Sequence, residues 1–244
     1  MLSSRLLSPG QSATFCSFSR RCLALLALLT LPSLVFAHNV DTSDAAFLQA
    51  QSGVVFWPYL YLGAKHMVTG LDHLLFLAGV VFFLRGLRDI AIYVSLFALG
   101  HSLTLIFGVI FELNANPYLV DAIIGLSVVY KALENLAQQR NWDFGLDTRA
   151  AVFVFGLCHG LGLATKLRQI TLPEDGLVVN LLAFNLGVEL GQLLALSVIV
   201  LLVFVWRHRP QFSAQATVAN WLIMTGGFLL MGIQLTAYWV ASNH

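Results

Sequence analysis

The stretch His66-Met67-Val68-Thr69-Gly70-Leu71-Asp72-His73-Leu74-Leu75-Phe76 decides the fold, because it opens an apolar run and yet carries two imidazoles and a carboxylate. The run continues to about position 84, which predicts a membrane helix. An ionisable side chain near the centre of a bilayer costs roughly 2.5–3.5 kcal/mol on insertion scales. Asp72 and His73 are therefore expected either to serve a function or to contact partners that offset this free energy.

The composition indicates an integral membrane protein. Of the 244 residues, 58% are hydrophobic and 10% are charged, whereas soluble domains carry about 25% charged residues. The net charge of +1 argues for neither nucleic acid nor an acidic substrate. The expected partners are therefore the lipid bilayer and a small ligand, with no nucleic acid.

Residues 1–37 are expected to form a secretory signal peptide. Arg20 and Arg21 close a basic segment, positions 22–36 are apolar, and Val35-Phe36-Ala37 resembles a small-residue cleavage site. The alternative is an uncleaved first helix, but the apolar segment is short for a span, which needs about 20 residues. Cleavage would make His38 the mature N-terminus, followed by an exposed arm over 38–52.

The remainder of the chain, 53–244, is expected to form one transmembrane domain of the all-α class, a polytopic bundle of six helices. The spans are expected at about 67–84, 89–111, 118–137, 149–165, 177–206 and 218–240. The aromatic-rich stretch 54–62 suits the headgroup level ahead of the first span, where such rings are enriched.

Lysine and arginine are distributed unequally over the expected loops. With an exported N-terminus, the outer ends carry Lys65, Lys166 and Arg168, and the cytoplasmic ends carry Arg85, Arg88, Arg140, Arg149, Arg207 and Arg209. The positive-inside rule therefore favours a multi-pass protein of the inner (plasma) membrane with both mature termini outside.

The expected spans bring a set of polar side chains to similar depths, in the outer half to the middle of the bilayer. The set comprises Asp72, His73, His101, His159 and Glu189, with Asn185 near Glu189. Asn185 and Glu189 are four residues apart and share one helix face. His66 and His73 would lie about 10 Å apart along a straight helix. They can share an ion only if the chain breaks between them, and Gly70 is where it could; otherwise His66 lies at the periplasmic mouth.

Imidazole, carboxylate and amide ligands suit Ni, Co, Zn, Mn or Fe(II). We therefore predict a metal site formed by His66, Asp72, His73, His101, His159, Asn185 and Glu189. Within it, Asp72 is expected to orient a neighbouring imidazole. The structural alternative for His101 alone is a hydrogen-bonded contact between helices.

Other residues have simpler expected roles. Asp121 is expected at the outer interface, and Lys131 and Glu134 are expected to pair or to reach the cytoplasmic headgroups. The motifs Gly156-x-x-x-Gly160 and Gly187-x-x-x-Gly191 have the spacing that lets helix backbones approach each other.

Several motifs resemble the HupE/UreJ family of hydrogenase- and urease-accessory membrane proteins, which are regarded as nickel or cobalt permeases. They are His66-x5-Asp72-His73, Gly100-His101-Ser102-Leu103-Thr104-Leu105, Ala132-Leu133-Glu134-Asn135, Phe155-Gly156-Leu157-Cys158-His159-Gly160-Leu161-Gly162 and Asn185-Leu186-Gly187-Val188-Glu189-Leu190-Gly191-Gln192. The nickel-permease branch has a second histidine and an acid after its His-Gly motif. Here Gly162 and Leu163 follow, and the acid nearest in sequence is Glu174. The chain therefore resembles more closely a sister branch whose substrate is less well defined.

The resemblance implies a secondary permease for a divalent transition-metal cation, with Ni or Co favoured and Zn as a further candidate, and no catalytic residues. The sequence has no Walker motif, so no nucleotide is expected. An intramembrane metal-dependent hydrolase with a His/Asp/Glu zinc site is the alternative function. Ligation of a b-type haem by His101 and His159 is a third. Two kinds of protein partner are compatible with this reading: further copies of the chain in a homo-oligomer, and proteins of metalloenzyme maturation.

Overall fold

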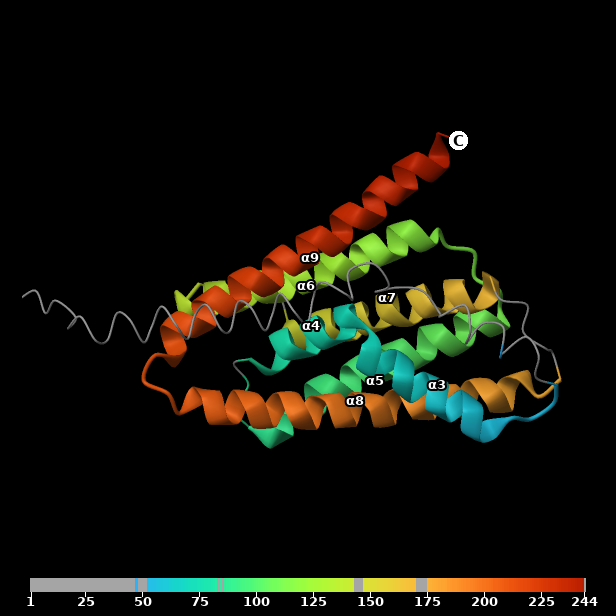
Figure 1. Cartoon of the computed structure of the whole chain (residues 1–244), viewed down its shortest axis with the longest axis horizontal. Helices are drawn as coiled ribbons and strands as arrows, with labels where there is room; N and C mark the ends of the chain where they lie inside the picture. Colours follow the sequence, from blue (N-terminus) through green and yellow to red (C-terminus); the bar gives the residue numbers. More distant parts are fainter. Residues whose placement is uncertain are drawn as a thin grey trace, which may run out of the picture. The chain divides into compact units, whose positions relative to one another are not determined.

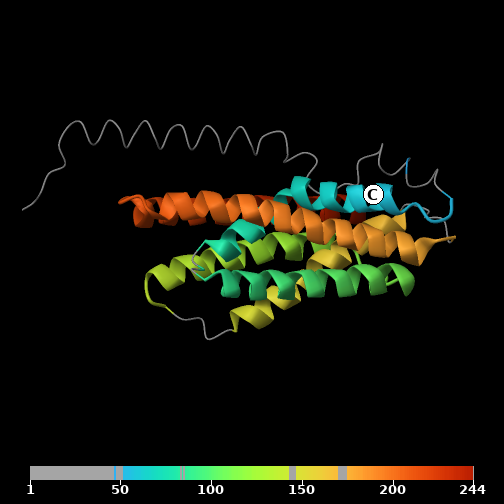
Figure 2. The ribbon, with the colours of Figure 1, turned by 90° about the horizontal axis from the view of Figure 1, so that it is seen from below.

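The computed structural model describes residues 47, 52–82, 84, 86–142, 147–169 and 175–243. These residues form helices and no strand, which confirms the all-α class. The helices are α3 (Phe56–Thr69), α4 (Leu71–Val81), α5 (Leu87–Ile110), α6 (Pro117–Gln139), α7 (Thr148–Gln169), α8 (Leu177–Arg207) and α9 (Phe212–Ser242) (Figures 1 and 2). The signal peptide expected over 1–37, most of the arm expected over 38–52, Arg85 and Glu174 lie outside the described residues.

Four of the described helices, α5, α7, α8 and α9, are long and apolar enough to cross a membrane. The 23-residue helix α6 is of similar length but carries Asp121, Lys131 and Glu134. Helix α4 is apolar and shorter. The protein is therefore a helical membrane protein, as the composition indicated.

The expectation of one continuous first span over 67–84 is wrong. Helix α3 ends at Thr69 and α4 begins at Leu71, with Gly70 extended between them (φ −69°, ψ 108°). The Gly70 N–H donates to the carbonyl oxygen of His66 at 2.9 Å and closes α3. Most of the aromatic stretch expected ahead of the span lies inside α3, because this helix starts at Phe56 and packs along α8.

Three close helix pairs build the bundle: α3 with α8, α5 with α7, and α6 with α9. Each pair crosses at glycines, where the absence of a side chain lets the two backbones touch. A Cβ on Gly191 would lie 2.7 Å from the Ala64 carbonyl oxygen, and a Cβ on Gly160 would overlap the carbonyl oxygen of His101. The two Gly-x-x-x-Gly motifs are thus confirmed as helix-crossing points.

The contacts also fix the relative directions of the paired helices. Contacts along α5 and α7 advance together, from Gly156 beside Phe97 to Gly160 beside His101, so these helices run parallel. Those along α3 and α8 advance together in the same way. Contacts between α6 and α9 advance in opposite directions, so this pair is antiparallel.

Helix α4 contacts α3, α5, α6, α8 and α9 and therefore lies in the middle of the bundle. Its C-terminal end is bound by the Arg207 guanidinium of α8, which donates to the carbonyl oxygens of Val81, Phe82 and Leu84 at 2.5–2.8 Å. The Val81 carbonyl oxygen also accepts from the Leu84 N–H at 3.2 Å. Carbonyl groups at a helix C-terminus lack partners within the helix, and a cation there also complements the helix dipole. Arg207 thus stabilises a short helix end that would otherwise be poorly satisfied inside a membrane.

We predict that Gly160→Ala destabilises the protein, whereas Gly232→Ala does not. A Cβ at position 160 forces α5 and α7 apart, but one at position 232 meets nothing within 4 Å. Overpacking costs about 1–3 kcal/mol, and replacing an unconstrained helical glycine by alanine gains about 0.5–1 kcal/mol. Thermal unfolding in detergent, followed by circular dichroism, should give a lower midpoint only for Gly160→Ala. Equal midpoints for the two variants would contradict the backbone contact between α5 and α7.

Candidate functional site

Four imidazoles gather where α4 meets α3, α5 and α7. The ring centroid of His73 lies 5.1 Å from that of His66, 5.2 Å from that of His159 and 5.9 Å from that of His101. His66 belongs to the last turn of α3 and His73 to the first turn of α4. The break at Gly70 therefore brings together two imidazoles that a straight helix would hold about 10 Å apart.

Gly70 provides the space into which two site residues fit. A Cβ at this position would lie 2.5 Å from Nδ1 of His73 and 3.1 Å from Oδ1 of Asp72. The same two atoms lie 3.2 Å from each other, and both side chains are 4% exposed. The carboxylate of Asp72, in the first turn of α4, is also favoured by the positive end of the helix dipole. Asp72 is thus positioned to orient the imidazole of His73.

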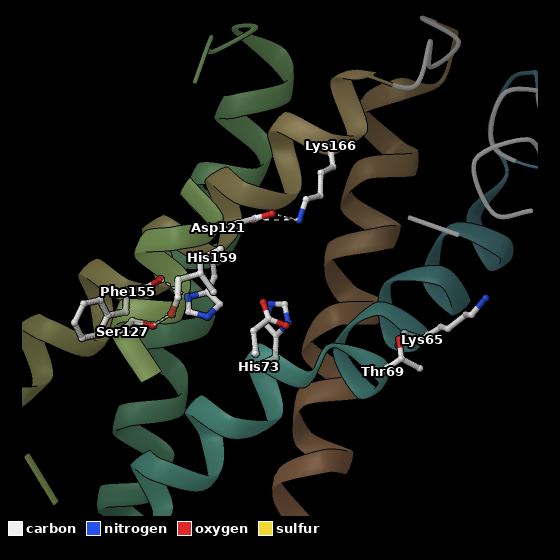
Figure 3. Close-up of polar contacts among 10 residues, drawn as sticks. Lys65, Thr69, His73, Asp121, Ser127, Phe155, His159 and Lys166 are labelled. Carbon is white, nitrogen blue, oxygen red and sulfur yellow. Dashed lines mark hydrogen bonds and ion pairs between the residues drawn. The ribbon is translucent and has the colours of Figure 1, made fainter. Parts of the chain in front are cut away.

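The imidazole of His159 is held by its own helix. Its Nδ1 lies 2.7 Å from the carbonyl oxygen of Phe155 (Figure 3). Because a carbonyl only accepts, Nδ1 must carry the proton, and the lone pair of the neutral ring is then on Nε2. Hydrogen bonds of this kind fix the tautomer of histidines that bind metals through the other nitrogen. Figure 3 shows this ring turned toward His73.

His101 does not make the hydrogen bond between helices that was the structural alternative for it. Its side chain is 1% exposed, and neither ring nitrogen has a hydrogen-bond partner among the described residues. The nearby hydroxyl of Thr104 makes the contact between α5 and α7 instead, donating to the Leu157 carbonyl oxygen at 2.6 Å. A buried polar group without a partner costs about 1–3 kcal/mol. Hydrogen bonding within the protein therefore does not explain a histidine at this position.

The imidazoles are close together without forming a coordination sphere. Across the described ranges, no group of three or more His, Cys, Asp or Glu side chains converges so as to hold a metal ion. The spacing is nevertheless suitable, since a tetrahedral metal with bonds of about 2.0–2.1 Å to imidazole nitrogens separates ring centroids by about 5 Å. His73 lies at 5.1 and 5.2 Å from two other rings.

Asn185 and Glu189 of α8 pair with each other, as their spacing predicted. The Asn185 amide donates to Glu189 Oε1 at 3.4 Å. Asn185 is buried, and Glu189 is partly exposed. Helix α8 reaches the imidazoles through Phe184, whose ring centroid lies 6.3 Å from that of His66. The structure therefore brings five of the seven predicted site residues together. The other two, Asn185 and Glu189, form their own pair on α8.

The charged side chains Asp121, Lys131 and Glu134 of α6 form ion pairs. Asp121 is buried, and its carboxylate lies 2.8 Å from the ammonium group of Lys166 in α7 (Figure 3). The long side chain of Lys166 reaches inward from the end of α7 and supplies the partner that burial requires. Lys131 and Glu134 pair at 2.7 Å, which confirms the pairing expected for them. Glu134 also accepts a hydrogen bond from Thr148.

Sequence reasoning missed the phenylalanines that contact the imidazoles. Phe97 is 1% exposed, and its ring centroid lies 5.0 Å from that of His159 and 6.2 Å from that of His101. The sequence does contain a signal for this arrangement, because Phe97-x-x-x-His101 and Phe155-x-x-x-His159 repeat one spacing. That spacing places each phenylalanine one helical turn from its histidine.

Comparison with known proteins gives a family. Neither the curated proteins nor the solved structures contain a match to this chain. A family model described as HupE / UreJ protein matches residues 42–242. This range covers most of the chain and includes every residue of the predicted site, so the chain belongs to the HupE/UreJ family.

Proposed function

We propose that this protein is a secondary permease that carries a divalent transition-metal cation across the membrane. The HupE/UreJ family is associated with nickel or cobalt transport or accessory function, and this favours Ni or Co as the cation. The observation that carries the proposal is the position of His73, whose ring centroid lies within 5.9 Å of imidazoles from three other helices. Imidazole is a good ligand for Ni, Co and Zn.

The energetics of burial support a cation at this place. His73 Nε2 and both ring nitrogens of His101 are buried, and within the described residues they have no hydrogen-bond partner. A divalent cation would offset part of their desolvation by accepting one nitrogen lone pair from each neutral ring. The Asp72 carboxylate, 3.2 Å from His73, would balance part of the cation's charge.

The proposal assigns a role to each predicted residue. His73, His101 and His159 bind the cation after their rings turn toward a common point. Asp72 orients His73, and His66 lies on the α3 side of the site, where it receives the cation first. Asn185 and Glu189 complete the site from α8, where the Glu189 carboxylate adds a negative charge. No nucleotide takes part, since the sequence has no Walker motif.

We further propose six membrane crossings, in which α3 and α4 together make the first. The parallel pairs α3/α8 and α5/α7 and the antiparallel pair α6/α9 are those that six alternating crossings require. Arg88, Arg140, Arg149, Arg207 and Arg209 then lie at one end of the bundle, which the positive-inside rule makes cytoplasmic. The inner membrane, removal of a signal peptide over 1–37 and outer mature termini belong to the same proposal.

We predict that His101→Ala, His159→Ala and Glu189→Gln abolish most metal uptake at matched protein levels. Each change removes one proposed ligand or charge without adding volume to the core. Uptake by proteoliposomes should be measured with Ni, Co, Zn, Mn and Fe(II) in parallel, together with metal binding to purified protein. His208→Ala is the matched control, because His208 is exposed and its Nδ1 lies 2.8 Å from its own helix's Phe204 carbonyl oxygen.

Wild-type uptake by all three site variants would contradict the assignment of these residues. Turnover of an amide or lipid substrate by the zinc-loaded protein, together with no metal uptake by proteoliposomes, would contradict the proposed permease function.

We predict that a periplasmic-active reporter fused after residue 244 is active, and that the same reporter in the turn between α8 and α9 is inactive. Six crossings with an outer mature N-terminus place these two positions on opposite sides. Alkaline phosphatase activity, normalised to the amount of fusion protein, measures the side. Activity only in the α8–α9 turn would overturn the orientation and the assignment of its outer face.

A further inference from the structure

Each of three imidazoles in the cluster has a phenylalanine one helical turn away on the same helix. The pairs are His73 with Phe76 in α4, His101 with Phe97 in α5, and His159 with Phe155 in α7. The phenylalanine follows the histidine in α4 but precedes it in α5 and α7. Helices α5 and α7 run parallel, and the Phe76 ring of α4 contacts the phenylalanine of each. The Phe97 ring of α5 also contacts the His159 ring of α7. All three phenylalanines therefore lie on one side of the imidazoles.

The three rings form a continuous aromatic layer, defined here as Phe76, Phe97 and Phe155. The Phe76 ring centroid lies 5.2 Å from that of Phe97 in a stacked pair and 5.9 Å from that of Phe155. Phe76 and Phe97 are 0% and 1% exposed. The layer also contacts the imidazoles directly, since Phe97 lies 5.0 Å and Phe76 5.5 Å from the His159 ring.

Polar groups also lie on the side of the aromatic layer that faces away from the imidazoles. The Tyr130 ring of α6 contacts Phe155 at 5.3 Å, and one turn further along α6 Glu134 binds Lys131 and Thr148. These groups lie toward the end of the bundle where Arg207 binds the C-terminus of α4, which we call the Arg207 end. The aromatic layer therefore separates two polar regions, the imidazoles and the Arg207 end.

We infer that the aromatic layer is the barrier that closes the imidazole cluster from the Arg207 end, and that the Phe97 ring is its movable part. Closely packed aromatic rings offer water and ions no polar partner, so a constriction of this kind excludes both until a ring moves. Phe97 contacts three imidazoles, at 5.0, 6.2 and 6.5 Å, so a change in their orientation is coupled to its position. The identity of the ion that crosses the barrier rests on the proposed function. The exclusion of water depends only on the packing of the aromatic layer.

The test is the exchange of the imidazole C2 hydrogen with deuterium, measured residue by residue by mass spectrometry on the full-length protein in detergent without added metal. In Phe97→Leu, exchange at His101 and His159 should be severalfold faster than in wild type. Phe76→Leu should have the same effect and serves as a second variant if the first folds poorly. Exchange at His66, whose ring contacts are with His73 and Phe184, should stay at the wild-type rate.

Phe82→Leu is the matched control. Phe82 is 3% exposed and packs on Trp206 and Phe212, at 5.5 and 6.0 Å, away from the imidazoles. The inference is overturned if both layer variants leave His101 and His159 at wild-type rates, or if Phe82→Leu accelerates them equally. If wild-type proteoliposomes take up no metal, the proposed function fails, and the exchange rates still decide whether the barrier exists.

Discussion

The interruption of one apolar segment at Gly70 is the constraint on which the other features of this bundle depend. A break inside a membrane protein frees backbone groups that lipid cannot satisfy, so each end needs a partner within the protein. At the break, the Gly70 N–H closes α3 on the His66 carbonyl oxygen. At the far end of α4, Arg207 binds the carbonyl oxygens that the short helix leaves open. These contacts hold α4 in the centre, with its first turn facing the imidazoles of three other helices.

The frame around the site is held by backbone contacts and by amides. Glycine crossings fix α3 on α8 and α5 on α7 at van der Waals distance. On the opposite side of α4, the buried amide of Asn135 donates to the Gly79 carbonyl oxygen at 2.8 Å and to Asn220 at 2.9 Å. His101 differs from these amides, because neither of its ring nitrogens has a hydrogen-bond partner among the described residues. The ring nitrogens of His101 are therefore available to a ligand, as expected for a residue that binds a cation.

The sequence predicted the features that depend on local spacing. The helical class, the glycine crossings and the Asn185–Glu189 pair all follow from periodicity or from residue type. Gly70 was identified only as a place where the chain could break, and one span was expected over 67–84. The sequence did not predict contacts in which a long side chain from a distant segment reaches a buried polar group. The pairing of Asp121 with Lys166 was not predicted, because the two residues are 45 positions apart and nothing local indicates that they meet. The Arg207 contacts with α4 span more than 120 residues and were missed for the same reason.

The central claim is that the imidazoles gathered by the break at Gly70 hold one divalent cation. X-ray absorption spectroscopy of the purified protein loaded with Co²⁺ or Ni²⁺ tests it most directly, because imidazole ligands give characteristic multiple scattering. The account predicts imidazole nitrogens at about 2.1 Å, with fewer of them in His101→Ala and in His159→Ala. A metal surrounded only by oxygen ligands, or a spectrum that these two substitutions leave unchanged, would contradict it.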